Sequence, residues 1–235
     1  MGKVFAVSDL HGQYDLWKQI QKFLQSDDIL YVLGDAADRG PDGWKIIKEA
    51  LADKRVKYIR GNHDQFLLDA WRSEWRDTYI WFYNGGYETY DAVLMDERAD
   101  IYLAELARKP LYECYVNKEG QSIHLSHAGF TLMQDDAIPP KDDLLWDRDH
   151  IGDRCNWWPE TNPVDYVVHG HTYCASRSGF ALTPVELNNS HTVGRYCHGH
   201  KICIDGRSFF TNKIAMLDLD TLQEEVFYAE QDGND

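Results

Sequence analysis

The sequence predicts an α/β fold built as one domain, and two observations lead to this expectation. Three short apolar runs, at 3–7, 29–33 and 56–59, have the length and composition of buried strands, and each is followed by apolar residues at helical spacing. Repeated strand–helix units pack as a mainly parallel sheet with right-handed crossovers. The 235 residues are enough for one large domain with a substantial core.

The predicted elements follow one another closely along the chain. In the first half, strands at 3–7, 29–33 and 56–59 alternate with helices at 14–24 and 44–52. A helical insert is expected at about 65–110, with helices at 65–81 and 99–107 and a break at Asn84-Gly85-Gly86.

The second half of the chain is richer in strands. They are expected at 111–116, 122–125 and 164–168, followed by antiparallel strands at 201–205, 214–219 and 225–228. The stretch 135–163 is polar and reads as irregular. The domain is therefore expected to span 1–230, with 231–235 as a disordered acidic tail.

Composition and charge argue against several classes of protein. A formal charge of −15 disfavours binding to nucleic acid or to anionic membrane surfaces, because phosphate groups are held by basic surface. No apolar stretch is long enough to span a membrane, and the first apolar run is too short for a signal peptide. The five cysteines are scattered, as expected for reduced thiols. We therefore expect a cytoplasmic protein. We also expect a monomer, although the sequence itself does not fix the oligomeric state.

Polar side chains of the metal-binding type follow five of the predicted strands. In chain order they are Asp9 and His11, Asp35, Asn62, His127 and His171. The carboxyl ends of strands are where α/β folds place their chemistry. Carboxylate, amide and imidazole groups without a thiolate suit divalent ions such as Mn²⁺, Fe²⁺ or Zn²⁺. Any one of these residues alone is more often structural, but five such strand ends together favour a shared metal site.

The motifs at these strand ends resemble those of the calcineurin-like metallophosphatases. The matching segments are Asp9-Leu10-His11-Gly12, Gly34-Asp35, Asp38-Arg39-Gly40, Gly61-Asn62-His63-Asp64, His127-Ala128-Gly129 and Gly170-His171-Thr172. More narrowly, the set is similar to the phosphoprotein phosphatase branch in its short bacterial and lambda-phage form. Thr172-Tyr173 stands where many phosphodiesterases of the superfamily carry a second His, and this difference favours the protein phosphatase branch.

This resemblance implies a β-sandwich core of mixed sheets flanked by helices, with two divalent metal ions. Mn²⁺ is the expected metal, with Fe or Zn as alternatives. One ion is implied to be held by Asp9, His11 and Asp35, and the second by Asp35, Asn62, His127 and His171. Asp35 would thus bridge the two ions, and a hydroxide activated by both would attack phosphorus directly.

The resemblance also implies roles for four residues outside the ligand set. His63 would be the general acid that protonates the leaving group, and Asp38 would keep its imidazole protonated. Arg39 and Arg148 would bind the non-bridging oxygens of the phosphate.

Three histidine-containing or acidic features receive no catalytic role. Asp64 is expected at most to position its loop. His169 precedes His171 and is left out of the ligand set. The tract from Cys197 to His200 is interpreted as an exposed turn between strands, since no second cysteine pair completes a zinc site.

The leading hypothesis is a metal-dependent phosphomonoesterase acting on phosphoproteins, at Ser or Thr, with Tyr left open. Symmetrical hydrolysis of dinucleoside tetraphosphates is the alternative, because that family resembles this one in the same motifs. A non-catalytic metal-binding module is disfavoured, since His63, Asp38 and Arg39 are all present. The expected partner is accordingly a phosphoprotein or a small phosphate ester.

Overall fold

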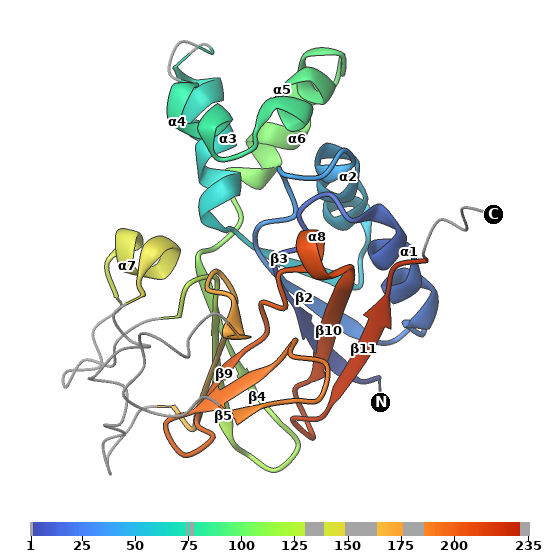
Figure 1. Ribbon diagram of the computed structural model, residues 1–235, viewed down its shortest axis with the longest axis vertical. Coiled ribbons are helices and arrows are strands. Elements are labelled where there is room, and N and C mark those ends of the chain that lie inside the picture. The colour runs from blue at the N-terminus through green and yellow to red at the C-terminus, as the bar shows by residue number, and fades with distance from the viewer. Residues whose placement is uncertain are drawn as a thin grey trace.

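The computed structural model describes residues 2–73, 75, 78–129, 139–148, 164–175 and 186–230. They form two β-sheets, with helices beside one sheet and a further group of helices projecting beyond the strands (Figure 1). The expected α/β class and the β-sandwich core of mixed sheets are both confirmed. None of the described helices is long and apolar enough to cross a membrane.

The strands divide between a five-stranded and a six-stranded sheet. The first contains β1 (Val4–Val7), β2 (Ile29–Leu33), β3 (Val56–Ile59), β10 (Lys213–Asp218) and β11 (Glu224–Tyr228). The second contains β4 (Tyr112–Val116), β5 (Ser122–Ser126), β6 (Tyr166–His169), β7 (Glu186–Leu187), β8 (Gly194–Tyr196) and β9 (Lys201–Cys203). Their spatial orders are β11-β10-β1-β2-β3 and β4-β5-β6-β9-β8-β7.

The helices of the described segments lie mostly in the first half of the chain. They are α1 (Tyr14–Phe23), α2 (Gly43–Ala52), α3 (Asn62–Arg72), α4 (Tyr79–Tyr83), α5 (Tyr87–Leu94), α6 (Ala99–Leu106), α7 (Lys141–Trp146) and α8 (Ser208–Thr211). Helices α3 to α6 form the projecting group in Figure 1.

Alternation along the strands of the five-stranded sheet builds two separate cores. In β1, Phe5 and Val7 belong to the cluster shared with the helices, whereas Ala6 belongs to the cluster between the two sheets. Val32 and Leu33 of β2 divide in the same way. Successive side chains of a strand point to opposite faces, so a sheet covered on both faces is apolar at every position. This explains the unbroken apolar runs in the sequence.

Strand direction brings the loops that carry the motifs to one place. β1, β2 and β3 are parallel to one another, and so are β5, β6 and β9. The expectation that 201–205 would pair only antiparallel is wrong. β9 lies between β6 and β8, so it is parallel to the first and antiparallel to the second.

The helical insert differs from the prediction in detail. The helix expected at 65–81 begins earlier, at Asn62, and is divided into α3 and α4. Trp75, between them, has a left-handed backbone with φ of 64°, which a continuous helix cannot contain. α5 was not predicted, and it buries Val93 in the core shared with the other helices.

Part of the stretch that reads as irregular in the sequence is also helical. α7 begins directly after Pro140 and buries Leu144 and Leu145. Two apolar residues in one helical turn are too weak a periodic signal to be recognised in a polar segment. The acidic tail expected at 231–235 lies outside the described residues.

Candidate active site

The six predicted metal ligands gather where the two sheets present the carboxyl ends of their parallel strands. The loops after β1, β2 and β3 supply Asp9, His11, Asp35 and Asn62, and the loops after β5 and β6 supply His127 and His171. His171 is 8% exposed and the other five are 3% exposed or less. Six buried polar side chains in one place are costly unless they bind one another or a ligand.

The backbone at this edge is strained. Left-handed φ values occur at Asp9 (55°), His11 (43°), Asp35 (54°), Asp38 (67°), Arg39 (65°) and His171 (64°). This conformation costs a residue with a side chain roughly 1–2 kcal/mol, and such strain is found mainly at functional sites. Six of the ten predicted site residues therefore adopt a backbone that stability alone does not favour.

The donor atoms of the predicted ligands lie close to one another. Nε2 of His127 is 2.8 Å from Oδ1 of Asn62 and 3.3 Å from Oδ2 of Asp35. Nδ1 of His171 is 2.9 Å from the same Asn62 oxygen. Nε2 of His11 lies 3.9 Å from Oδ2 of Asp35. The Asp35 carboxylate thus lies between the histidines of both sheets, as a bridging ligand should.

Two of these histidines are oriented by backbone carbonyls. Nδ1 of His11 lies 2.9 Å from the carbonyl oxygen of Ala37, and Nδ1 of His127 lies 2.8 Å from that of Leu33. A carbonyl only accepts, so each imidazole carries its proton on Nδ1 and directs Nε2 into the site. This arrangement is typical of histidines that bind metal ions.

The residues present fit a pair of divalent cations. Donor atoms of two groups, His11–Asp35–His63 and Asp35–His127–His171, each lie within 4.8 Å of one another. Among the described residues, buried Nε2 of His171 has no hydrogen-bond partner. Burial, followed by the charge on His127, holds the pKa of His171 well below its usual range, so the ring is the neutral form that binds metals.

The first of these groups contains His63 where the sequence led us to expect Asp9. The nearest contact between Asp9 and His11, from Oδ1 to Nε2, is 3.7 Å. The other Asp9 oxygen accepts from the Ser8 hydroxyl at 2.6 Å and from the His171 backbone N–H at 2.9 Å. One Asp9 oxygen therefore faces the histidine, while the other joins the β1 loop to the β6 loop.

His63 is held by a carboxylate, which favours a role other than metal binding. Its Nδ1 lies 2.7 Å from Oδ2 of Asp38, and both side chains are buried. The same Asp38 oxygen accepts from the indole N–H of Trp81 at 2.8 Å. The backbone N–H of Asp38 donates to the Thr89 hydroxyl at 3.0 Å. The insert helices α4 and α5 thus fix the carboxylate that orients His63.

Arg39 lies between two of the site imidazoles. Its Nη1 is 2.7 Å from Nε2 of His11, and its Nη2 is 3.0 Å from Nε2 of His63. A guanidinium only donates, so both Nε2 atoms accept in this structure. The Arg39 backbone N–H donates to the carbonyl of Gly85 at 2.9 Å, so the Asn84-Gly85-Gly86 turn positions this arginine.

Asp64, which had no assigned role, is a structural clamp. Its carboxylate accepts from the backbone N–H of Gly61 at 2.8 Å and of Asp35 at 3.3 Å, and from the Tyr58 hydroxyl at 3.0 Å. Gly61 has φ of −100°, so a left-handed turn is not the reason for glycine. A Cβ there would instead collide with the Asp35 carboxylate.

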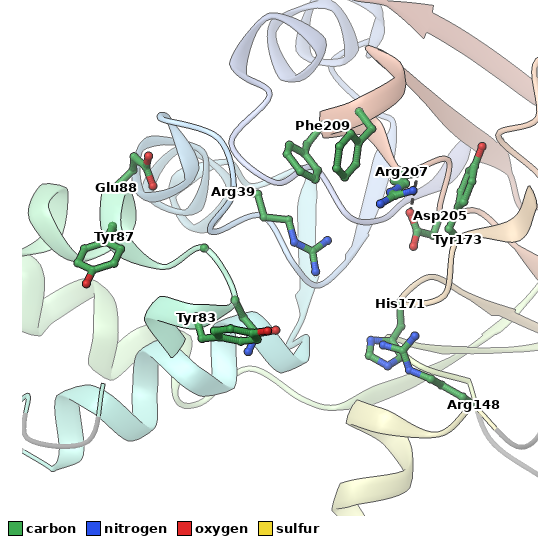
Figure 2. Close-up of a pocket in the computed structure, with 13 residues that line it drawn as sticks. Arg39, Tyr83, Tyr87, Glu88, Arg148, His171, Tyr173, Asp205, Arg207 and Phe209 are labelled. Atoms are coloured by element: carbon green, nitrogen blue, oxygen red, sulfur yellow. Dashed lines mark hydrogen bonds between the residues drawn. The ribbon is translucent and has the colours of Figure 1, made fainter. Parts of the chain in front are cut away.

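An open cavity of about 770 Å³ leads to this site. Figure 2 shows Arg39 on one side of it, with Arg148 beside His171 on the other. Its rim is aromatic, with Tyr83 and Tyr87 from the insert. The two arginines predicted to bind phosphate therefore face one cavity, next to the gathered ligands.

The two histidine-containing features that were set aside lie apart from this chemistry. Nε2 of His169 is 2.5 Å from the Tyr196 hydroxyl, and burial lowers the pKa of His169 to about 3. Cys197 to His200 form a turn between β8 and β9, as interpreted from the sequence, although Cys197 itself is buried. His198 is exposed.

Sequence reasoning missed the supporting residues. Tyr58 and Trp81 donate to the carboxylates of Asp64 and Asp38, and Thr89 accepts from the Asp38 backbone N–H, but all three stand in ordinary apolar or helical patterns. One available signal was Gly86, where a Cβ would collide with the Trp81 ring. Asp205, which lines the cavity after β9, follows a sixth parallel strand, and its direction was not recognised.

Known proteins similar to this chain include two kinds of phosphatase. The match to the symmetrical bis(5'-nucleosyl)-tetraphosphatase of Buchnera aphidicola is 39% identical, covering 28% of this chain and 25% of the relative. Serine/threonine-protein phosphatase 1 of Salmonella typhimurium is 37% identical over 35% of this chain and 38% of the relative. Serine/threonine-protein phosphatase 2 of Escherichia coli is 25% identical over 72% of this chain and 78% of the relative. The first two matches thus span about a quarter and just over a third of the relatives' lengths.

Solved structures share the fold over nearly the whole chain. A protein assigned as a diadenosine tetraphosphatase has a TM-score of 0.67 at 16% identity, covering 98% of this chain and 95% of the other. A Saccharomyces cerevisiae serine/threonine phosphatase has a TM-score of 0.60 at 16% identity, covering 99% of this chain and 82% of the other. At these identities the likeness shows the fold alone.

The family model for calcineurin-like phosphoesterases matches residues 2–175. That range includes all six predicted ligands, together with His63, Asp38 and both cavity arginines described above. The chain therefore belongs to the calcineurin-like phosphoesterase family.

Proposed function

We propose that this chain is a Mn²⁺-dependent phosphomonoesterase that removes phosphate from serine and threonine side chains of cytoplasmic phosphoproteins. The observation that carries this proposal is the His63–Asp38 pair, at 2.7 Å, beside the gathered ligands and the cavity arginines. A phosphate monoester of an alcohol has a strongly basic leaving group, and its cleavage requires a proton donor. All ten residues of the proposed site belong to one chain, so we propose a monomer as the active form.

The proposed ligand set would hold two cations. Asp9, His11 and Asp35 would hold one, and Asp35, Asn62, His127 and His171 the other. When bound, such a pair supplies the Lewis acidity that activates water and neutralises charge on phosphate. Burial acts to raise the pKa of Asp35, but the surrounding histidines, His127 first, outweigh it and hold that pKa well below its usual range. The central carboxylate is therefore ionised and suited to a cation.

The chain's own residues would divide the remaining tasks. Arg39 donates to Nε2 of His63 in this structure, so that nitrogen carries no proton here. A bound phosphate offers Arg39 better acceptors than an imidazole does. Arg39 would turn to the phosphate, and Nε2 of His63 would then be able to carry the proton for the leaving oxygen. Asp38 favours that protonated form through Nδ1.

Arg148 would bind the phosphate from the opposite side of the cavity. It lies beside His171, and its positive charge is one of the influences that lower the pKa of that histidine. A planar guanidinium can donate two parallel hydrogen bonds to phosphate oxygens. Substrate phosphate would thus be held between arginines from two distant loops.

Symmetrical cleavage of dinucleoside tetraphosphates is the second candidate. It is supported by the Buchnera tetraphosphatase match, although that match covers only 28% of this chain. The match to phosphatase 2 of Escherichia coli covers 72% of the chain and supports the first candidate.

A substrate panel assayed with Mn²⁺ distinguishes the two. Phosphoserine, phosphothreonine and phosphotyrosine peptides would be compared with diadenosine tetraphosphate by kcat/KM, and with enzyme treated with a chelator. We expect the phosphoserine and phosphothreonine peptides to be preferred. A higher kcat/KM on diadenosine tetraphosphate would replace the first candidate with the second.

A further inference from the structure

The cavity contains a third arginine that the proposed chemistry does not use. Arg207 lies on the cavity wall, and Figure 2 places it on the side of Tyr173 and Asp205. It is exposed, and no described carboxylate lies within ion-pair distance of its guanidinium. An arginine whose guanidinium forms no ion pair with a described carboxylate, at the mouth of a phosphate site on a protein of charge −15, is available to an anion from outside.

An aromatic shelf, formed by Phe209 and Phe210 of α8, supports two of the cavity arginines. The two ring centroids are 4.1 Å apart. Cζ of Arg207 lies 3.9 Å from the Phe210 ring centroid, and Cζ of Arg39 lies 5.8 Å from that of Phe209. Each of two neighbouring rings thus carries one guanidinium group. Stacking on a ring leaves the edge of a guanidinium, with its N–H donors, free for an anion.

The shelf is fixed relative to the metal-binding loop. The Ser208 hydroxyl donates to the backbone carbonyl of Asp9 at 2.5 Å and contacts that of Leu10 at 3.3 Å. The backbone N–H of Arg207 donates to Oδ1 of Asp205 at 2.7 Å. These bonds hold Arg207 in a left-handed conformation with φ of 55°. Strain of this kind, locked by its surroundings, presets the direction of the side chain.

We propose that Arg207 is a specificity residue that binds a second anionic group, next to the phosphate that is removed. The inference rests on the proposed phosphoprotein function and names its preferred substrates as phosphopeptides with an acidic side chain flanking the phosphorylated residue. Arg39 and Arg207 lie on adjoining rings, so one peptide can reach both, its phosphate at the first and its carboxylate at the second. Glu88, on the insert side of the cavity in Figure 2, disfavours an acidic residue there and so directs the carboxylate towards Arg207.

Two phosphoserine peptides that differ only at the flanking residues test this proposal. One carries aspartates on both sides of the phosphoserine and the other carries asparagines, and both are assayed with Mn²⁺ at low ionic strength. For the unmodified protein we expect KM to be about three- to tenfold lower for the acidic peptide, with kcat changed less than twofold. The preference should shrink at high salt, because exposed charges are screened.

Variants assign the preference to Arg207. R207Q should bring the two KM values together, whereas R207K, which keeps the charge but loses the planar fork, should keep part of the difference. R98Q is the matched control, because Arg98 is exposed and lies over the Tyr102 ring, at 5.4 Å, but does not line the cavity. It should keep the full preference. Thermal unfolding of R207Q checks that the fold is retained.

The outcomes separate the two proposals. Equal KM values for the two peptides in the unmodified protein, or an acidic preference that survives R207Q, overturn the role of Arg207 and leave the phosphatase proposal standing. Hydrolysis of diadenosine tetraphosphate with neither peptide cleaved overturns both.

Discussion

The carboxylate of Asp64 accepts a hydrogen bond from the backbone N–H of Asp35, 29 residues earlier in the chain. It also accepts from Gly61, so one buried side chain joins the loop after β2 to the loop after β3. Both loops carry proposed metal ligands, and their relative position depends on this carboxylate.

Asp64→Ala should therefore destabilise the protein strongly. It leaves two backbone N–H groups and the Tyr58 hydroxyl buried without an acceptor, and each such group costs about 1–3 kcal/mol. We expect the free energy of unfolding in urea to fall by at least about 3 kcal/mol, the lower end of the sum over the three groups. Tyr58→Phe, which removes one donor and leaves the carboxylate its other partners, should cost about 1 kcal/mol or less. Equal losses of unfolding free energy in the two variants would contradict the role of Asp64 as the side chain that joins the two loops.

His63→Asn should separate substrates by the basicity of their leaving groups. Loss of a general acid lowers kcat by about 10²–10⁴ where the leaving group needs a proton. We expect that loss on a phosphoserine peptide and a much smaller loss on p-nitrophenyl phosphate, whose leaving group is stable as an anion. Steady-state assays of both substrates with Mn²⁺ measure the difference. An equal loss of kcat on the two substrates would show that His63 is not the general acid.

Trp81→Phe should impair His63 as the proposed general acid, although Trp81 itself would not contact the substrate. The indole N–H donates to the same Asp38 oxygen that faces His63, and it therefore shares the negative charge that favours a protonated imidazole. Without this donor, the Asp38 carboxylate should be held less firmly, and with it the His63 ring. We expect kcat on a phosphoserine peptide to fall severalfold, with a smaller fall on p-nitrophenyl phosphate. Phe82→Leu serves as a packing control on the same helix, because the Phe82 ring lies beside that of Trp81, with centroids 5.6 Å apart, and has no polar atom. It should leave both rates nearly unchanged.

Removal of metal should lower both activity and stability. A ligand that binds only the folded state stabilises it, by about 2.7 kcal/mol when present at a hundred times its dissociation constant. Mn²⁺ should therefore raise the Tm of chelator-treated protein and restore its activity. Asn62→Ala, which removes the oxygen that faces both His127 and His171, should reduce the metal-induced shift in Tm. An unchanged shift would exclude Asn62 from the ligand set.

Asp96→Asn should destabilise the protein in a pH-dependent way. Asp96 accepts from Lys48 at 2.6 Å and from the Trp44 indole at 2.9 Å, and these contacts, that of Lys48 first, lower the pKa of Asp96 to about 2. A lowered carboxyl pKa contributes stability in full above the unfolded-state value, here 3.8, and that contribution is lost as pH falls through about 2.

For this partly exposed pair we expect a loss of about 1 kcal/mol at pH 7. The difference from the unmodified protein should be smaller at pH 3, in urea unfolding followed by circular dichroism. Glu97→Gln, at an exposed neighbouring position, is the control and should change stability little at either pH. A difference for Asp96→Asn that is the same at both pH values would show that the carboxylate charge is not the cause.

Much of the fold and of the candidate site was predictable, because both depend on signals local in the sequence. The apolar runs of β1, β2 and β3 are unbroken, since both faces of the sheet are covered. The proposed ligands stand directly after such runs, and parallel strands bring their carboxyl ends together. The pairing of His63 with Asp38 was expected from the family resemblance and is present in the structure.

What could not be predicted depends on contacts between distant segments. β9 gives no local sign that it lies between β6 and β8. Trp81 was expected to be a packed aromatic, and its indole N–H finds Asp38 only because the insert folds back over the β2 loop. Arg207 is exposed directly before α8, and its stacking on Phe210 depends on a left-handed backbone at Arg207 that only the folded structure reveals.

The proposed ligands are divided between the two sheets, and this has a consequence for folding. Four come from the five-stranded sheet and two from the six-stranded sheet, and they meet only when the sheets have closed on each other. A partly folded chain with one sheet formed would hold at most four of the six ligands. Tight metal uptake would then report that the whole domain has assembled, and a newly made chain would gain activity and its last increment of stability in the same event.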